Sequence, residues 1–219
     1  MGKIMFDKLQ KPIVEEFLKD PFLTKQFYFT GGTALSLIYI HHRQSEDLDF
    51  FSEKPFPKER IISFMNTFSK KHRCSLILRQ PEELDLLIFD STYASGGRIR
   101  VDFNHYPFPL IEKGKIIDGL RIDSLRDIAT NKLITINQRT NVKDFVDLYF
   151  LFQHYTLWDL LYGVEAKFGV KLDLAMIASD FLKVEEFDFL PKMLVPLTNQ
   201  ELTAFFKEKA REIGKRITK

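Results

Sequence analysis

The sequence has little cysteine and no long apolar segment. Its single cysteine, Cys74, cannot form an internal disulfide, which suits the reducing cytoplasm. No run of apolar residues approaches the roughly 20 that a membrane-spanning helix needs. The N-terminus lacks the apolar stretch and the small-residue cleavage site of a secretory signal. We therefore expect a cytoplasmic protein that has no membrane partner.

A strong excess of charge of one sign is also missing. The 32 Lys and Arg residues against 30 Asp and Glu residues leave a net charge of only +2. A nucleic-acid partner would therefore need a local basic patch rather than the charge of the whole molecule. The chain also lacks a Gly/Ser linker, a low-complexity segment and an internal repeat. Its five histidines have no metal-ligand spacing with the cysteine, which argues against a zinc site.

The hydrophobic share of 45% and the charged share of 28% are ordinary for a globular protein. The pattern changes near residue 124. Before it, short apolar runs alternate with helical patterns, and after it helical periodicity dominates. We predict an α+β fold, with a mixed β-sheet and flanking helices in a domain at 1–123. A C-terminal helical bundle is expected in a second domain at 124–219.

The expected elements follow from periodicity and from turn and cap residues. Strands are predicted at residues 27–30, 47–51, 74–79, 84–90 and 98–106. Helices are predicted at residues 6–19 (broken or restarted at Pro12), 33–42, 57–71, 124–138, 141–154, 156–168, 173–183 and 199–217. Ser95, Gly96 and Gly97 form a turn signal, and Asp123-Ser124 and Asn141 are expected helix caps.

Gly31 and Gly32 lie between a predicted strand and a predicted helix. Two glycines let the backbone pass close to a ligand, and a helix start offers unpaired N–H groups and a positive dipole end. Thr33 adds a hydroxyl suited to a phosphate oxygen. A Gly-Gly pair alone is more often only a turn, so its meaning depends on the residues that follow.

Asp47 and Asp49 alternate with apolar residues. Residues i and i+2 of a strand point to the same face, so the two carboxylates project together while Leu48 and Phe50 face the core. Such a pair repels itself unless a cation lies between the carboxylates. Oxygen ligands of this kind favour Mg²⁺, which commonly binds one or two carboxylates together with substrate phosphates.

Asp102 is a lone carboxylate in an otherwise apolar strand. If that strand lies beside 47–51, Asp102 completes a three-carboxylate cluster that can hold two Mg²⁺ ions. One ion would sit on a triphosphate, and the other would lower the pKa of an attacking hydroxyl. A pair of aspartates alone is more often a solvated strand face or a turn cap. The glycine turn upstream and Asp102 downstream together favour the functional interpretation.

Residues 31–51, GGTALSLIYIHHRQSEDLDFF, resemble the first motif of the AbiEii-type nucleotidyltransferases. These belong to the DNA polymerase β-like superfamily and include toxins of bacterial toxin–antitoxin pairs. The superfamily pattern is a glycine turn, a helix, a carboxylate–apolar–carboxylate strand and a third carboxylate on a later strand. The matching positions are Gly31, Gly32, Asp47, Asp49 and Asp102. The step His42-Arg43-Gln44-Ser45 narrows the resemblance to the AbiEii-like branch.

A second segment is similar to the same family: Lys132 on one predicted helix, followed on the next helix by the run Lys143-Asp144-Phe145-Val146-Asp147-Leu148. The resemblance covers roughly residues 25–155 in all. It implies that Lys132 binds the triphosphate and that Asp144 is needed for activity, with a base as one possible role. Read from the residues alone, Lys132 is an ordinary solvated lysine. Asp144 and Asp147 share a helix face and repel each other without a cationic partner such as Arg139 or Lys143. A purely structural network is therefore an open alternative.

Two residues just before the carboxylates have two interpretations each. Arg43 either contacts a phosphate or stacks on the base, or it forms an ion pair with Glu46 or Asp47. Ser45 either caps a turn or contacts a phosphate or a metal-bound water. We include both in the candidate nucleotide-binding set, which comprises Gly31, Gly32, Thr33, Arg43, Ser45 and Lys132.

The resemblance implies transfer of a nucleoside monophosphate from an NTP to an acceptor, with release of pyrophosphate and two Mg²⁺ ions as cofactors. Asp47, Asp49 and Asp102 would be the metal ligands and catalytic carboxylates, with Asp144 as a further catalytic residue. The implied acceptor is an RNA 3′ end such as that of tRNA, and a toxin would bind a cognate antitoxin. A small-molecule or protein acceptor and a non-catalytic nucleotide-binding module stay open as alternatives.

The last predicted helix is rich in both charge and apolar residues. One interpretation is an amphipathic helix with a solvated charged face. The other is a basic ridge that steers an RNA acceptor. The cations of this ridge are Lys207, Lys209, Arg211, Lys215, Arg216 and Lys219. The single tryptophan, Trp158, is expected to pack in the helical half.

Overall fold

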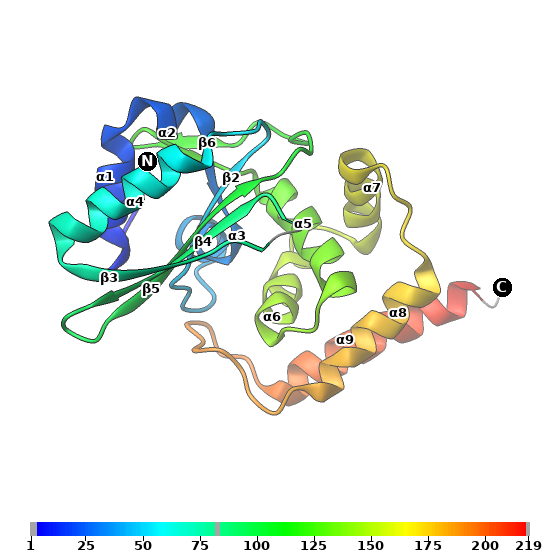
Figure 1. Ribbon diagram of the computed structural model, residues 1–219. Coiled ribbons are helices and arrows are strands. Elements are labelled where there is room, and N and C mark those ends of the chain that lie inside the picture. The colour runs from blue at the N-terminus through cyan, green and yellow to red at the C-terminus, as the bar shows by residue number, and fades with distance from the viewer. Residues whose placement is uncertain (1–3, 82–83, 218–219) are drawn as a thin grey trace. The chain divides into compact units, whose positions relative to one another are not determined.

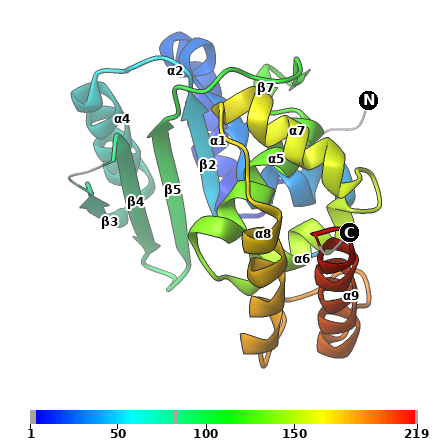
Figure 2. The same ribbon diagram turned by 90° about the vertical axis from the view of Figure 1, so that its right-hand side faces the viewer.

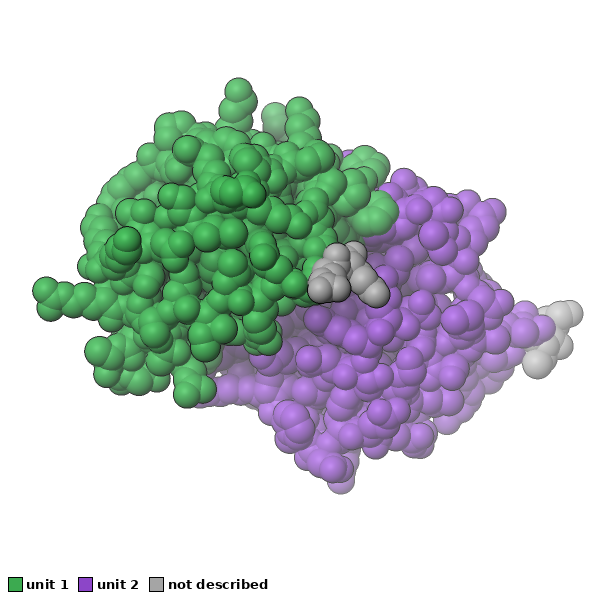
Figure 3. All heavy atoms as spheres, viewed as in Figure 1, with its two compact units in different colours: residues 1–38, 45–109, 113–123 green, residues 39–44, 110–112, 124–219 purple. Residues whose placement is uncertain are grey.

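The computed structural model describes residues 4–81 and 84–217, so Lys219 of the predicted basic ridge lies outside it. The chain divides into two compact units, which Figure 3 colours separately. Unit 1 comprises the chain up to residue 38, 45–109 and 113–123. Unit 2 comprises 39–44, 110–112 and the chain from residue 124 onward. Two short segments from the N-terminal half therefore pack with the C-terminal helices.

Unit 1 is built on a seven-stranded mixed sheet in the order β3-β4-β5-β2-β1-β7-β6. The central strand β2 pairs in parallel with β5 and antiparallel with β1. The strands are β1 (Tyr28–Thr30), β2 (Leu48–Ser52), β3 (Cys74–Arg79), β4 (Leu86–Tyr93), β5 (Arg98–His105), β6 (Lys115–Ile117) and β7 (Leu120–Ile122). The mixed sheet of the predicted fold class is confirmed.

Alternation of buried and less buried residues gives the sheet one apolar face. On that face, Phe17 of α1 stacks on Phe50 with ring centroids 4.3 Å apart, and Phe64 of α4 meets Phe103 edge-on. Figure 1 shows α1 and α4 crossing the same side of the strands. The helices of unit 1 are α1 (Gln10–Lys19), α2 (Pro21–Gln26), α4 (Lys58–His72) and α3 (Gly31–Ala34), which continues into a π-helical segment, Leu35–Ile40.

Several predicted boundaries are wrong in unit 1. The first helix begins at Gln10, with Pro12 in its first turn, where the missing N–H costs nothing. The predicted helix 33–42 begins at Gly31 and ends at Ile40. The predicted strand 47–51 is shifted by one residue, so Asp47 precedes β2. Helix α2 and the β6–β7 hairpin are absent from the prediction, because elements this short show no usable periodicity.

Unit 2 is helical, as predicted for the C-terminal bundle. Its helices are α5 (Leu125–Gln138), α6 (Val142–Leu151), α7 (Leu157–Phe168), α8 (Leu174–Leu182), a 3₁₀ turn (Lys183–Glu186) and α9 (Asn199–Ile217). Figures 1 and 2 show α8 and α9 side by side. Ser124 and Asn141 cap α5 and α6 as expected. Among the described residues, no helix combines the length and the apolar character needed to cross a membrane.

We expect Phe50→Ala to lower the free energy of unfolding by about 3–5 kcal/mol. Phe50 is fully buried and contacts the rings of Phe17 and Phe103. Its truncation removes these contacts and leaves a cavity in the core of unit 1. The matched control is Phe189→Ala, because Phe189 is 68% exposed. Urea titration should show a change within about 0.5 kcal/mol for the control. Equal losses in the two variants would contradict this account of the core.

Candidate active site

The two strand aspartates lie next to each other in the sheet. Asp49 of β2 is level with Asp102 of the parallel strand β5, and Leu48 and Phe50 are buried on the opposite face. Neighbouring strands lie about 4.8 Å apart, so the two carboxylates emerge side by side on one face. Asp47, half-buried, stands just before β2. The strand pairing on which the three-carboxylate prediction depended is present.

Asp102 experiences the electrostatic strain expected of clustered carboxylates. Burial, reinforced by the negative charges of Asp49 and Asp47, raises the pKa of Asp102 to about 7, and Arg100 offsets only part of the rise. The Oδ1 atom of Asp102 is buried and has no hydrogen-bond partner within the described part of the chain. Within the described residues, this buried acceptor oxygen therefore lacks a hydrogen-bond donor, and the nearby charge of Arg100 is shared with Asp90.

These carboxylates fit Mg²⁺ in part. Their donor atoms are all carboxylate oxygens, the ligands that Mg²⁺ prefers, and the buried Asp102 Oδ1 is an acceptor that a cation would satisfy. Within residues 4–81 and 84–217, however, no three Asp, Glu, His or Cys side chains converge closely enough to hold an ion. Because Mg²⁺ typically takes one or two carboxylates plus substrate phosphates, the neighbours Asp49 and Asp102 suffice for the fit.

Gly31 has a specific steric role beside Asp49. Its φ of +74° is in the left-handed region that side-chain-bearing residues rarely adopt. A Cβ on Gly31 would overlap the carboxylate of Asp49. The start of α3 therefore passes directly against a predicted metal ligand. The glycine is needed there for this close approach as well as for its backbone conformation.

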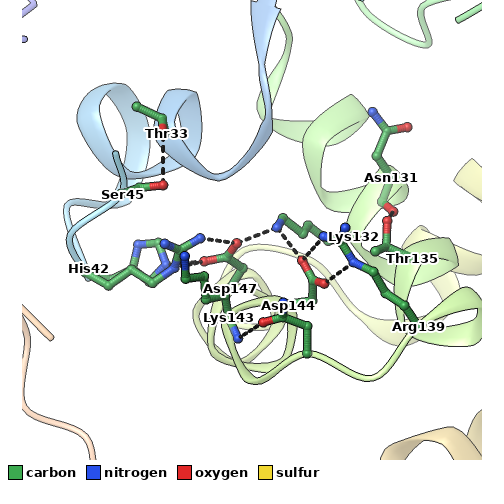
Figure 4. A network of polar contacts seen from close by, with 12 residues as sticks. Thr33, His42, Ser45, Asn131, Lys132, Thr135, Arg139, Lys143, Asp144 and Asp147 are labelled. Carbon is green, nitrogen blue, oxygen red and sulfur yellow. Dashed lines mark hydrogen bonds and ion pairs between the residues drawn. The ribbon is translucent and has the colours of Figure 1, made fainter. Parts of the chain in front are cut away.

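The loop before the carboxylates is held by buried polar side chains. Thr33 is fully buried, and its hydroxyl donates to Ser45 Oγ at 2.8 Å (Figure 4). Gln10 Nε2 donates to the backbone carbonyls of Ser45 at 3.0 Å and Glu46 at 3.2 Å. The Thr33 hydroxyl is therefore buried against Ser45. Sequence reasoning missed Gln10, although a polar residue in register with the apolar stripe of Ile13 and its successors is a usable signal.

In unit 2, Asp147 is the centre of a buried ion network. Its carboxylate accepts from Arg43 Nε at 2.6 Å and Arg43 Nη2 at 2.8 Å, and it contacts His42 Nε2 at 2.7 Å and Lys132 Nζ at 2.6 Å. Asp147 is fully buried and Arg43 is only 2% exposed. The partner of Arg43 is thus Asp147 rather than the predicted Glu46 or Asp47. The expectation of a solvated Lys132 from its residue type alone is wrong.

Asp144 extends this network. Lys132 Nζ donates to Asp144 Oδ1 at 2.7 Å, and Arg139 Nε donates to Asp144 Oδ2 at 2.8 Å. Figure 4 shows the Lys132 ammonium between the carboxylates of Asp144 and Asp147. Arg139 is therefore a cationic partner, as one alternative predicted, while the side chain of Lys143 is exposed.

Charge pairing overrides burial in this network. Burial alone would raise the pKa of Asp147, but Lys132 and Arg43 hold that pKa well below its usual range. The pKa of Asp144 follows the same pattern: burial alone would raise it, but Lys132 and Arg139 lower it. Burial would lower the pKa of Lys132, and the two aspartates outweigh it. An aspartate kept ionised by two cations is a weak proton acceptor, so the geometry favours a positioning role for Asp144 over a base.

The structure thus divides the candidate residues into two sets. Unit 1 contains Gly31, Gly32, Thr33, Ser45, Asp47, Asp49 and Asp102. Unit 2 contains Arg43, Lys132 and Asp144, joined by His42 and Asp147.

Three solved structures have a similar fold. JHP933 from Helicobacter pylori matches with a TM-score of 0.57 and 23% identity over 96% of this chain and 91% of that one. A putative nucleotidyltransferase from H. pylori matches with a TM-score of 0.58 and 22% identity over 96% and 94%. MenT4, the nucleotidyltransferase toxin Rv2826c of Mycobacterium tuberculosis H37Rv, matches with a TM-score of 0.56 and 13% identity over 93% of this chain and 82% of that one. The fold is that of nucleotidyltransferases.

The family model described as nucleotidyl transferase AbiEii toxin, type IV toxin–antitoxin system, matches residues 13–212. The chain belongs to this AbiEii family, which confirms the resemblance of its first motif. It is also 32% identical over 197 residues to the uncharacterized protein aq_aa25 of Aquifex aeolicus (strain VF5), covering 87% of this chain and 89% of that protein.

We expect Gly31→Ala to impair both stability and nucleotidyl transfer. The alanine pays the left-handed strain and also displaces the Asp49 carboxylate, and misplacing a catalytic group by about 1 Å costs on the order of 100-fold in rate. Gly169→Ala is the matched control, because Gly169 has a φ of +67° and open space around its Cα. It should lose only about 1–2 kcal/mol of stability and keep its activity. Equal activity in the two variants would refute the steric role of Gly31.

We expect Asp147→Asn to destabilise the protein by about 3–5 kcal/mol at neutral pH, because Arg43 and Lys132 lose their shared counter-charge. The folded pKa of Asp147 is depressed, so its contribution is complete above the unfolded value of about 3.9 and disappears as pH falls below it. The stability gap between wild type and variant should therefore narrow on acidification below about pH 4. Urea titrations across pH, with exposed Asp188→Asn as control, measure this gap. A pH-independent gap would argue against the ion network.

Proposed function

We propose that the protein is the toxin of a cytoplasmic toxin–antitoxin pair that transfers a nucleoside monophosphate from an NTP to an RNA 3′ end, such as that of tRNA. Pyrophosphate is the second product. The observation that carries the proposal is the side-by-side placement of Asp49 and Asp102, with Gly31 packed against Asp49. Membership of the AbiEii family supports the same reaction class.

Asp49 and Asp102 would hold Mg²⁺, and the nearby charge of Asp47, the third predicted ligand, would add to the attraction. When bound, the ion supplies positive charge to the triphosphate and lowers the pKa of the attacking hydroxyl. The buried, unpartnered Oδ1 of Asp102 among the described residues is the oxygen that most needs this charge. Asp102 would share the metal and help to deprotonate the acceptor hydroxyl.

The remaining residues of unit 1 would bind phosphate oxygens. Gly31 and Gly32 present backbone N–H groups at a helix start whose N-cap hydroxyl, that of Thr30, donates to Asp123 at 2.7 Å instead of capping the helix. The hydroxyl of Ser45, held in place by Thr33, would donate to an oxygen of the same triphosphate. These donors are neutral, so they orient the triphosphate without adding charge.

In unit 2, Lys132 would neutralise charge on the departing pyrophosphate. An ammonium has three protons, and two of them are directed at Asp144 and Asp147. The third is available for a phosphate oxygen. Asp144 and Asp147 would then act as positioning residues that fix the direction of this proton, and Arg43 would act through Asp147 rather than on the nucleotide directly.

The test is incubation with each labelled NTP, Mg²⁺ and total tRNA, followed by separation of labelled RNA. Wild-type protein should label RNA with at least one NTP, and EDTA should abolish the labelling. Asp49→Asn should lower the rate by at least about 100-fold, because the variant loses a metal ligand and a negative charge. Asp188→Asn, at an exposed aspartate, should leave the rate unchanged.

Incorporation that persists unchanged in Asp49→Asn would show that the proposed site is wrong. Labelling of a small molecule or a protein in place of RNA would refute the proposed acceptor and leave the chemistry standing. Binding of an NTP without any incorporation would favour a non-catalytic nucleotide-binding module. Co-purification with a small protein encoded beside the gene would test the proposed antitoxin partner independently.

A further inference from the structure

Unit 2 contains a groove of about 590 Å³ that the proposed chemistry does not use. It lies between the connection from α6 to α7 and the C-terminal part of α9. Its walls combine aromatic rings, chiefly Tyr155 and Trp158, with the cations Lys209, Lys215 and Arg216. The guanidinium of Arg216 lies over the Trp158 ring, 4.9 Å from its centroid.

The carboxylates of this groove already have partners. Asp159 caps α7, accepting from the Thr156 N–H at 2.8 Å and from its hydroxyl at 2.6 Å. Glu212 accepts from Lys209 at 3.0 Å. In contrast, no carboxylate of the described residues forms an ion pair with Lys215 or Arg216, and both are exposed. The groove therefore has uncommitted positive charge beside aromatic surface.

This combination selects one class of ligand. An apolar ligand has no use for exposed cations, and an acidic peptide has no use for stacked rings. Single-stranded nucleic acid uses both, because cations bind its phosphates while aromatic rings and arginine planes stack on its bases. We propose that the groove binds a single-stranded segment of the acceptor RNA, with phosphates on Lys215 and Arg216 and a base on the Trp158–Arg216 layer. The binding of single-stranded RNA in the groove is argued from the groove itself; that this RNA is the acceptor rests on the proposed function.

Trp158 makes the proposal directly measurable, because it is the only tryptophan of the chain. Titration with oligocytidylate, without NTP or Mg²⁺, should quench Trp158 fluorescence as a base stacks against the indole. Binding should weaken as salt rises, because phosphate contacts release counterions. Inorganic polyphosphate, which has charge and no bases, should displace the oligonucleotide and restore the fluorescence.

Two lysines of the same helix provide a matched comparison. Lys215→Gln removes a cation of the groove and should weaken oligocytidylate binding about fivefold, with the log–log salt slope reduced by about 0.7. Lys207→Gln removes a cation of α9 that is paired with Glu185 at 2.5 Å and does not line the groove. It should change affinity less than about twofold. Thermal unfolding of both variants checks that each is folded.

Absence of quenching, or equal weakening by the two lysine variants, would overturn the proposal. Quenching by polyglutamate with no response to oligocytidylate would also overturn it, and would identify an acidic protein as the occupant. The proposed function fails separately: quenching without NTP incorporation retains the groove and rejects the transfer. Conversely, wild-type protein could incorporate NTP into RNA without any quenching, and Lys215→Gln could do so at an unchanged KM. That result would retain the transfer and reject the groove.

Discussion

The arrangement of the candidate residues in unit 2 depends on the ion pairs and hydrogen bonds of one buried carboxylate, that of Asp147. It binds Arg43 through two hydrogen bonds, contacts His42, and shares Lys132 with Asp144. Each of these charges would be costly to bury alone, and together they satisfy one another. Because His42 and Arg43 stand only a few residues before Asp47 and Asp49, the chain that carries these two candidate metal ligands leaves unit 1, enters this network and returns within residues 38–45.

Unit 1 solves a different electrostatic problem. Asp49 and Asp102 stand side by side on β2 and β5, and Gly31 passes close to the Asp49 carboxylate. Unit 2 compensates every buried aspartate with a cation from the protein, whereas unit 1 leaves a buried carboxylate oxygen unpartnered within the described residues. This contrast separates the two kinds of site. The balanced network of unit 2 suits the positioning of its members, and the carboxylates of unit 1 suit the proposed Mg²⁺.

The sequence predicted this site unevenly, for physical reasons. Local alternation was enough to place Asp49 on the face opposite Leu48 and Phe50, whereas the position of Asp102 beside it depended on an assumed strand pairing that the structure confirms. The partner of Arg43 could not be predicted, because 104 residues separate it from Asp147 and only tertiary packing brings them together. Similarly, periodicity revealed the long helices and missed the three-residue strands β6 and β7. The burial of Lys132 was hidden because a lysine on a helix has the same local signature whether solvated or buried.

The excursion of residues 39–44 into unit 2 also governs how the protein can be divided and how it emerges during synthesis. A fragment that begins at Ser124 would retain Asp147, Asp144 and Lys132 and would lack Arg43 and His42, so Asp147 would lose two of its three partners. During translation, Arg43 leaves the ribosome long before α6 does. The helical unit therefore cannot complete its ion network as an isolated C-terminal fragment, and the early segment 39–44 must wait for α6 before Arg43 can pair with Asp147.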